Sequence, residues 1–509
     1  MLKTKTEKLL AVFVSLVSIA AIIWSYTSGW MIAYNDATAH LNTARRIVDN
    51  LTPGLVQIGS VWLPLLHILE MPFAMNFFLW QSGLAGAIVS GTSFIIASIF
   101  LYKILFFITK DKFAGVIGVL FFIANPNILY LQTAAMFEPL LIVTALGAVY
   151  FFLCWANEHK GHDLIRAAFF IMLATLTRYD GWALFAASIV FVIIVGLSFK
   201  RKGVSGTLIV YLFLAGFGIA LWFLYNLMIF NDPMYFASGE FSAKAQQDIL
   251  EARGALPTKH NLPLSALTYS LTVIFNNGVV AVSLALLGLL VYLFTKFKQL
   301  RNWAPLLLLI PFFFNILTLY LGQSVIWLPM IEPFFATYFN ARYGILMLPA
   351  IAFFIGFLAS KNIVFKVIIV LLGVVQIGLF AYPELFPMYG KQIGVITLQD
   401  TVSSVNANTE NASQYLHDHY KDGLILASSA SADAFIFRAG IPLKNFITEG
   451  TGYHWKNSMS YPPRYATWIV HFKDKSDRVG IAVKKTPDVQ KYYTKEYEDT
   501  TYEIWKKKS

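Results

Sequence analysis

The sequence has little cysteine and little charge, and each shortage excludes a class of protein. Its single cysteine, Cys154, lies in an apolar run, which excludes a disulfide framework and a cysteine-based metal site. Only 13% of the 509 residues are charged, whereas aqueous domains carry nearer a quarter. With 57% hydrophobic residues and a mean hydropathy of +0.61, the chain has too much apolar surface for a soluble fold. These values predict a polytopic membrane protein.

The sequence also lacks the motifs of soluble nucleotide-binding folds. Neither a phosphate-loop pattern nor a Gly-x-Gly-x-x-Gly run links a predicted strand to a predicted helix. The net charge of +11 has a plain explanation in a membrane protein, because lysine and arginine collect in cytoplasmic loops. We therefore expect no nucleic-acid partner.

About eleven hydrophobic segments approach the length of about 20 apolar residues that a helix needs to cross a bilayer. They lie near 9–29, 84–106, 113–131, 137–156, 164–178, 181–199, 206–230, 271–295, 303–321, 342–359 and 362–382. If the first is an uncleaved signal anchor with a cytoplasmic N-terminus, alternation places most loop lysines and arginines inside, as the positive-inside rule requires. The predicted outer segments are then 30–83, 125–136, 178–180, 231–270, 322–341 and the chain after 383.

A change of composition after residue 383 marks a second domain. Helix-like stretches at 408–420 and 433–438 alternate with strand-like runs, which is typical of a small α/β domain. The strand-like runs are 424–427, 444–448, 466–472 and 502–505, and 450–465 is expected to be an irregular loop. The predicted fold is a mainly α polytopic membrane domain at 1–383, with a first outer loop at 30–83, followed by an extracytoplasmic α/β domain at 384–509.

The first outer loop is the candidate active site. Asp36 and His40 are four residues apart and share one face of a helix whose apolar residues recur as far as Leu51. Such an amphipathic helix is suited to lie on a bilayer surface with its polar side facing the substrate. Trp62 and His67, near the end of the loop, are candidate substrate contacts. The alternative for Asp36 is a helix N-cap, which is the common use of an aspartate at such a place.

Glu138 is a second candidate acid, at the start of the segment 137–156. Its alternative role is local, since proline fits the first turn of a helix and an acid there suits the helix dipole. A carboxylate drawn into the bilayer costs on the order of a few kcal/mol, so spans seldom carry one without a task.

Two arginines lie at the predicted outer boundary, against the basic-inside bias. Arg178 and Arg342, each followed by a tyrosine (Tyr179 and Tyr343), are candidates for capturing a phosphate, because a guanidinium offers a planar fork of donors. The alternative for Arg178 is a local pair with Asp180, and for Arg342 a side chain that snorkels to the headgroups.

The outer segment 231–270 is the last candidate. It is either a lid that carries Lys244 and Arg253 over a lipid-phosphate headgroup or a solvated connector.

Taken in order, several motifs resemble the GT-C class of integral-membrane glycosyltransferases, and within it the protein O-mannosyltransferase and aminoarabinose-transferase-like group. The motifs are an acid soon after the first span, Trp62-Leu63-Pro64-Leu65, Asn125-Pro126-Asn127 … Phe137-Glu138-Pro139, Arg178-Tyr179-Asp180-Gly181-Trp182 and Asn340-Ala341-Arg342-Tyr343. The acidic pair often found in the first loop of that class is here Asn35-Asp36. The lysine-containing segment of the aminoarabinose enzymes is replaced by Ser60-Val61-Trp62-Leu63-Pro64, which leaves the donor sugar and metal use open. The tryptophan-pair signature of oligosaccharyltransferases is absent.

The resemblance implies an enzyme that uses a polyprenyl-phosphate sugar on the outer face of the plasma membrane. Asp36 matches the first-loop catalytic acid, and Glu138 matches the acid of the second outer loop. The acceptor hydroxyl would belong to a protein, a lipid or a cell-envelope glycan. A carboxylate can act as general base, and Arg342 with Lys244 or Arg253 can neutralise the departing phosphate. A divalent cation bridged by Asp36 or Glu138 is an alternative source of positive charge.

Two other functions compete with this one. A transporter or flippase of lipid-linked sugars would favour internal repeats and ionisable groups at mid-membrane depth, and the sequence shows neither. A glycan-binding protein would need one membrane anchor rather than about eleven spans.

Overall fold

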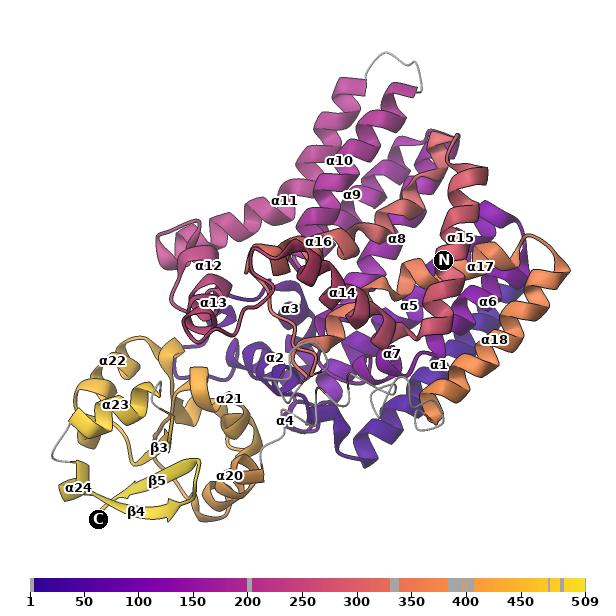
Figure 1. The fold of residues 1–509 in the computed structure, drawn as a ribbon. Coiled ribbons are helices and arrows are strands. Elements are labelled where there is room, and N and C mark those ends of the chain that lie inside the picture. Colours follow the sequence, from indigo (N-terminus) through magenta and orange to yellow (C-terminus); the bar gives the residue numbers. More distant parts are fainter. Residues whose placement is uncertain are drawn as a thin grey trace. The chain divides into compact units, whose positions relative to one another are not determined.

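Helices make up most of the described chain, and the longest of them are apolar (Figure 1). A computed structural model describes residues 4–198, 204–329, 338–382, 397, 400, 407–474, 477–485 and 489–508. The chain forms two compact units. The membrane unit consists of Met1–Ser25, Ser60–Leu66 and Val89–Ser403, and the sheet unit of Tyr26–Gly59, His67–Ile88 and Ser404–Ser509.

Eight helices in the described part of the chain are long and apolar enough to cross a membrane. They are α1 (Lys5–Thr27), α5 (Leu84–Thr109), α8 (Phe137–Glu158), α10 (Asp180–Ser198), α11 (Val204–Phe230), α15 (Val279–Lys296), α17 (Leu348–Ala359) with the 3-10 turn η5 (Ala341–Met347) before it, and α18 (Ile363–Ala381). Shorter helices are α3 (Leu65–Ala74), α4 (Phe77–Gln81), α6 (Lys112–Ile123), α7 (Pro126–Leu131), α9 (Gly161–Thr175), α14 (Leu262–Asn277) and α16 (Ile310–Tyr320). The predicted class, a polytopic helical membrane protein, is confirmed, while the count of eleven spans stays a prediction.

Two predicted segments are each divided into two helices. The segment 113–131 breaks between α6 and α7 because the Asn125 side chain accepts hydrogen bonds from the backbone N–H groups of Asn127 and Ile128 and so starts a new helix. The segment 271–295 breaks at Gly278, whose φ of +82° suits glycine. The Gln376 amide packs directly against Gly278 and accepts from the backbone N–H of Val280, at the start of α15.

The sheet unit contains a five-stranded sheet in the order β2-β1-β3-β5-β4. Its strands are β1 (Ile425–Leu426), β2 (Phe446–Ile447), β3 (Trp468–Phe472), β4 (Tyr493–Glu498) and β5 (Tyr502–Lys507). The pairs β1–β2 and β1–β3 are parallel, whereas β5 is antiparallel to β3 and β4. Its helices are α2 (Asn35–Arg46), α20 (Ala407–His419), α21 (Ser429–Arg438), α22 (Tyr453–Ser460), α23 (Arg478–Lys485) and α24 (Val489–Tyr492). The small α/β fold at the C-terminal end is therefore confirmed.

Three details of the prediction are corrected. The edge strand β4 was not predicted, because its mostly exposed residues show no alternation of apolar and polar side chains. The stretch 450–465 is not wholly irregular, since it contains α22. The helix of the first loop ends at Arg46 instead of continuing to Leu51. Its polar face is not open either, because His40, Asn42 and Arg45 are buried.

Most of the first outer loop and the C-terminal part form one compact unit, although they are far apart in sequence. Helix α2 packs on α21, which explains why a helix that is mostly polar can be buried on both faces. The domain boundary predicted after residue 383 falls among residues outside the described ranges and stays a prediction.

Candidate active site

In the membrane unit, Glu138 lies at the centre of a buried group of charges. It is in the first turn of α8, and only 1% of its surface is exposed. Its Oε1 accepts a hydrogen bond from Nη1 of Arg178 at 3.0 Å and from Nε of Arg342 at 3.2 Å. The residue before α8, Met136, makes no side-chain cap, and Glu138 pairs with the arginines instead. The structure therefore brings together three of the residues that the sequence singled out.

The two guanidinium groups also share an aromatic ring. The Cζ atoms of Arg178 and Arg342 lie 4.6 Å and 5.1 Å from the centre of the Tyr343 ring. Arg178 additionally pairs with Asp180 at 3.0 Å, so the local pairing that was the alternative for this residue does occur, beside the bond to Glu138. Two arginines and two acids thus make a charge-balanced group.

Arg342 does not snorkel to the membrane surface, because only 5% of its surface is exposed and its guanidinium pairs with Glu138. It stands in η5, after Asn340 at a left-handed φ of 54°. The preceding residue, Ala341, is fixed at both ends of its backbone. Its N–H donates to Asp400 at 3.0 Å, and its carbonyl accepts from Asn276 at 2.6 Å. Long-range contacts therefore place this arginine.

Removal of the Glu138 carboxylate should strongly destabilise the protein. In the Glu138→Ala variant the buried guanidinium of Arg342 and the mostly buried one of Arg178 lose their shared partner, and we expect the free energy of unfolding to fall by roughly 3–5 kcal/mol. Unfolding of the detergent-solubilised protein would measure this. The matched control is Glu251→Ala, whose pair with Lys259 is exposed and should contribute below about 1 kcal/mol. Equal losses in the two variants would contradict the central role of Glu138.

In the sheet unit, Asp36 lies in the first turn of α2. The N-cap of this helix is Tyr34, which makes no side-chain cap, so Asp36 is not the N-cap that its alternative interpretation requires. Asp36 is partly exposed, while Ala37 and Thr38 beside it are buried. Its carboxylate is thus held at the surface of a helix whose neighbouring residues are packed.

The two predicted histidines meet in the sheet unit. Nδ1 of His40 lies 3.2 Å from Nε2 of His67, and both side chains are buried. With ten residues, α3 is too short to cross a bilayer, so His67 belongs to the first loop. Burial, with smaller effects from the charges of His40 and Arg46, holds the pKa of His67 well below its ordinary value. His67 is therefore neutral near pH 7.

The remaining predicted contacts lie elsewhere. Trp62 is half-buried in the membrane unit. Tyr179 stacks on Phe236 with ring centres 5.9 Å apart. The segment 231–270 contains two short helices, α12 (Tyr235–Ser238) and α13 (Ala243–Ala252). Lys244 and Arg253 are exposed on and after α13 and are not part of the Glu138 group.

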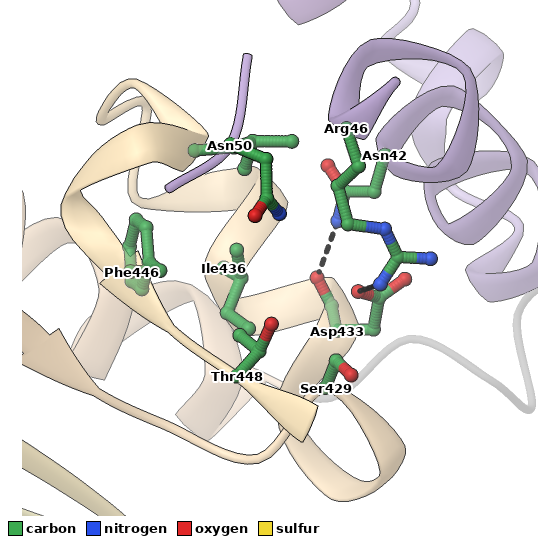
Figure 2. A pocket seen from close by; sticks show the side chains of 9 residues that line it. Asn42, Arg46, Asn50, Ser429, Asp433, Ile436, Phe446 and Thr448 are labelled. Atoms are coloured by element: carbon green, nitrogen blue, oxygen red, sulfur yellow. Dashed lines mark hydrogen bonds and ion pairs between the residues drawn. The ribbon is translucent and has the colours of Figure 1, made fainter. Parts of the chain in front are cut away.

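A small cavity lies between the first loop and the C-terminal part of the sheet unit (Figure 2). Its volume of about 10 Å³ is enough for about one water molecule. Asn42, Arg46 and Asn50 line it from the first loop, and Ser429, Asp433, Ile436, Leu443, Phe446 and Thr448 line it from the other side. Nη1 of Arg46 is 3.7 Å from Oδ1 of Asp433. An ion pair therefore joins two segments that are distant in sequence.

Asp433 should make the stability of the protein depend on pH. Burial raises its pKa from 3.8 to about 6, although Arg46 acts in the opposite direction. The folded state thus holds this proton more tightly than the unfolded state, and the contribution of Asp433 to stability falls as the pH rises through about 6. Between pH 5 and pH 8 the melting temperature of the Asp433→Asn variant should fall less than that of the unaltered protein, by on the order of a few degrees. Parallel melting curves would contradict this assignment.

Solved structures share the fold of this chain. A crystal structure of ArnT from Cupriavidus metallidurans bound to undecaprenyl phosphate aligns with a TM-score of 0.57 at 10% identity, over 97% of this chain and 97% of that one. The apo structure of the same protein aligns with a TM-score of 0.50 at 11% identity, over 96% and 97%. The fold is that of the GT-C glycosyltransferases. No protein-family model and no curated protein sequence matches the chain.

The GT-C fold confirms the resemblance predicted from the ordered motifs. An oligosaccharyltransferase from Archaeoglobus fulgidus, tethered with an acceptor peptide, aligns more weakly, with a TM-score of 0.47 at 12% identity over 100% of this chain and 74% of that one.

The sequence analysis missed one buried acid. Glu70, on α3, is fully buried, and neither of its carboxylate oxygens has a hydrogen-bond partner among the described residues. Burial raises its pKa well above the ordinary value, so this side chain is more readily protonated than an exposed glutamate. The signal that could have found it is the spacing of three residues from His67, which places both on one face of a helix.

The two carboxylates predicted as metal ligands, Asp36 and Glu138, have different surroundings. In the ranges that the structure describes, no three His, Cys, Asp or Glu side chains are arranged to hold a metal ion. A divalent cation on Glu138 would face two guanidinium groups, whose positive charge disfavours it. Glu138 therefore does not suit the role of a metal ligand, and metal binding by Asp36 stays a prediction.

Proposed function

We propose that this protein is a GT-C glycosyltransferase. It moves a sugar from a polyprenyl-phosphate donor to an acceptor hydroxyl at the outer face of the plasma membrane. The observation that carries the proposal is the pair of arginines, Arg178 and Arg342, held together on the single carboxylate of Glu138. The ArnT structure with the same fold was solved with undecaprenyl phosphate bound, which supports a donor of this class.

The arginine pair is suited to an anionic headgroup. Each guanidinium has five N–H donors, and Glu138 takes one donor from each. Two planar forks at a shared site can bind a phosphate with more than one hydrogen bond each, and their charge is independent of pH in the physiological range. In this arrangement Glu138 positions the arginines and keeps them together in the absence of the donor.

Asp36 is the proposed general base. It takes the proton of the acceptor hydroxyl while the hydroxyl oxygen forms a bond to the anomeric carbon of the sugar. The bond between that carbon and the phosphate oxygen breaks, and its electron pair leaves with the polyprenyl phosphate. This leaving group is a stable anion, since the second pKa of a phosphate ester is near 6, so no general acid is required. Arg342 stabilises the charge that develops on the phosphate.

The other predicted residues have secondary roles in this proposal. Lys244 and Arg253 add positive charge on the segment that follows α11. Trp62, Tyr179 and Tyr343 contact the sugar or the acceptor, whereas the buried side chains of His40 and His67 have almost no exposed surface for such a contact. The acceptor is a protein, a lipid or a cell-envelope glycan, and the lipid tail of the donor lies among the membrane helices.

Mass spectrometry of glycoconjugates from cells that lack this chain tests the proposal. We expect one class of glycoconjugate to lose a sugar while its lipid-linked donor accumulates. The competing function, a flippase, predicts instead that the donor accumulates on the cytoplasmic face, which protease-free membrane vesicles treated with an impermeant periodate reagent would reveal. Unchanged glycoconjugates together with unchanged donor levels would contradict both functions.

A further inference from the structure

The segment that carries Asp36 is held from outside the first loop. In the sheet unit, Nη2 of Arg438 donates a hydrogen bond to the carbonyl of Ile32 at 3.2 Å. The Asn42 side chain donates to the carbonyl of Asp433 at 3.0 Å (Figure 2). Ile32 precedes Asp36 and Asn42 follows it. Helix α21 therefore contacts the chain on both sides of the proposed base.

Further contacts between the same two segments extend this attachment. Arg46 pairs with Asp433. Near the end of the loop, the Gln81 side chain donates to the carbonyl of Phe437 at 3.0 Å, and the ring of Trp80 lies edge-on to that of Phe437 at 5.2 Å. We call the contacts of Asp433, Phe437 and Arg438 with the first loop the α21 clamp.

The N-cap residue of α2, Tyr34, makes no capping hydrogen bond with its side chain, and the short turn before it begins after Gly29, which has a left-handed φ of 74°. The first N–H groups of such a helix fray unless other contacts hold them. From outside the first loop, Arg438 supplies such a contact through its bond to Ile32, and it also pairs with Glu410 at 3.0 Å.

We propose that α21 is a positioning element for the proposed base, and that Arg438 and Asp433 fix the backbone on either side of Asp36. The clamp itself follows from the contacts of the sheet unit, whereas its effect on catalysis rests on the proposed function. A general base must be held within a fraction of an ångström of its working position, because a displacement of about 1 Å can cost on the order of 100-fold in rate. Helix α21 thus serves the reaction through the chain segment that carries Asp36.

Hydrogen exchange of the full-length protein in detergent tests the clamp independently of any activity. In the Arg438→Met variant, amides of residues 33–41 should exchange about tenfold faster, as expected for the loss of a hydrogen bond to a charged group. The Arg438→Lys variant, which keeps a donor, should recover part of the protection. The matched control is Glu410→Gln, which removes the other partner of Arg438 but leaves its bond to Ile32.

Sugar transfer by the same variants tests the link to catalysis. Arg438→Met should lower kcat by about tenfold or more and leave the KM for the polyprenyl-phosphate sugar within about twofold, because the donor site is unaltered. Unchanged exchange at 33–41 would overturn the clamp. Faster exchange with an unchanged kcat would overturn its catalytic role. If the unaltered protein transfers no sugar, the proposed function fails, and the exchange experiment still decides whether the clamp exists.

Discussion

Replacement of Asp36 by Asn is expected to lower the rate of sugar transfer by about 10²–10⁴-fold, which is the usual contribution of a general base. The amide has the same shape as the carboxylate but cannot accept the proton of the acceptor hydroxyl. Because Asp36 is partly exposed and does not cap α2, the change should leave the melting temperature nearly unaltered. Initial rates with purified polyprenyl-phosphate sugar, measured beside a melting curve, would separate the two effects.

The matched control for this variant is Asp418→Asn. Asp418 is an exposed acid on α20 of the sheet unit and accepts a hydrogen bond from Gln414. Its replacement makes the same chemical change without touching the first loop, and we expect an unchanged rate. If Asp36→Asn retained its rate as Asp418→Asn does, Asp36 would not be the base.

Replacement of Arg342 is expected to weaken donor binding by about 10- to 100-fold, the range expected for lost hydrogen bonds to a charged group. The Arg342→Lys variant is the more informative one, because it keeps a positive charge beside Glu138 while it removes the planar fork. We expect the KM for the donor to rise more than kcat falls. Steady-state kinetics with varied donor concentration would measure both constants.

The control for Arg342→Lys is Arg301→Lys, since Arg301 is exposed and bonds the Gln299 side chain. This variant should match the unaltered protein in both constants. A loss of stability in Arg342→Lys with unchanged donor affinity would leave Arg342 as a structural partner of Glu138 and would remove the phosphate role.

The membrane helices could be predicted from the sequence because their signal is local. A run of apolar residues long enough to cross a bilayer needs no information from the rest of the chain. The same local reasoning failed where a distant residue decides the structure. The break at Gly278 depends on Gln376, and the burial of α2 depends on α21. The edge strand β4 has a polar sequence whose strand character comes from its pairing with β5.

The candidate site shows the same limit more sharply. Glu138 and Arg342 could each be singled out as unusual charges at the predicted membrane boundary. Their hydrogen bond joins residues 204 positions apart, and no spacing in the sequence predicts it. A local role was a reasonable explanation for both Asp36 and Glu138. Asp36 is not the N-cap of α2, and Glu138 lies in the first turn of α8 but also pairs with two distant arginines. Glu70 was missed for the opposite reason, since a single acid in an apolar run looks like an ordinary exposed residue until its burial is known.

The measurement that tests the account most directly is the stoichiometry of the reaction in purified form. The full-length protein, reconstituted in vesicles with a labelled polyprenyl-phosphate sugar and an envelope extract as acceptor, should release one polyprenyl phosphate for each sugar that becomes covalently attached. Both quantities should fall together in the Asp36→Asn variant. Movement of the intact labelled lipid across the bilayer, with no covalent transfer, would contradict the proposed function.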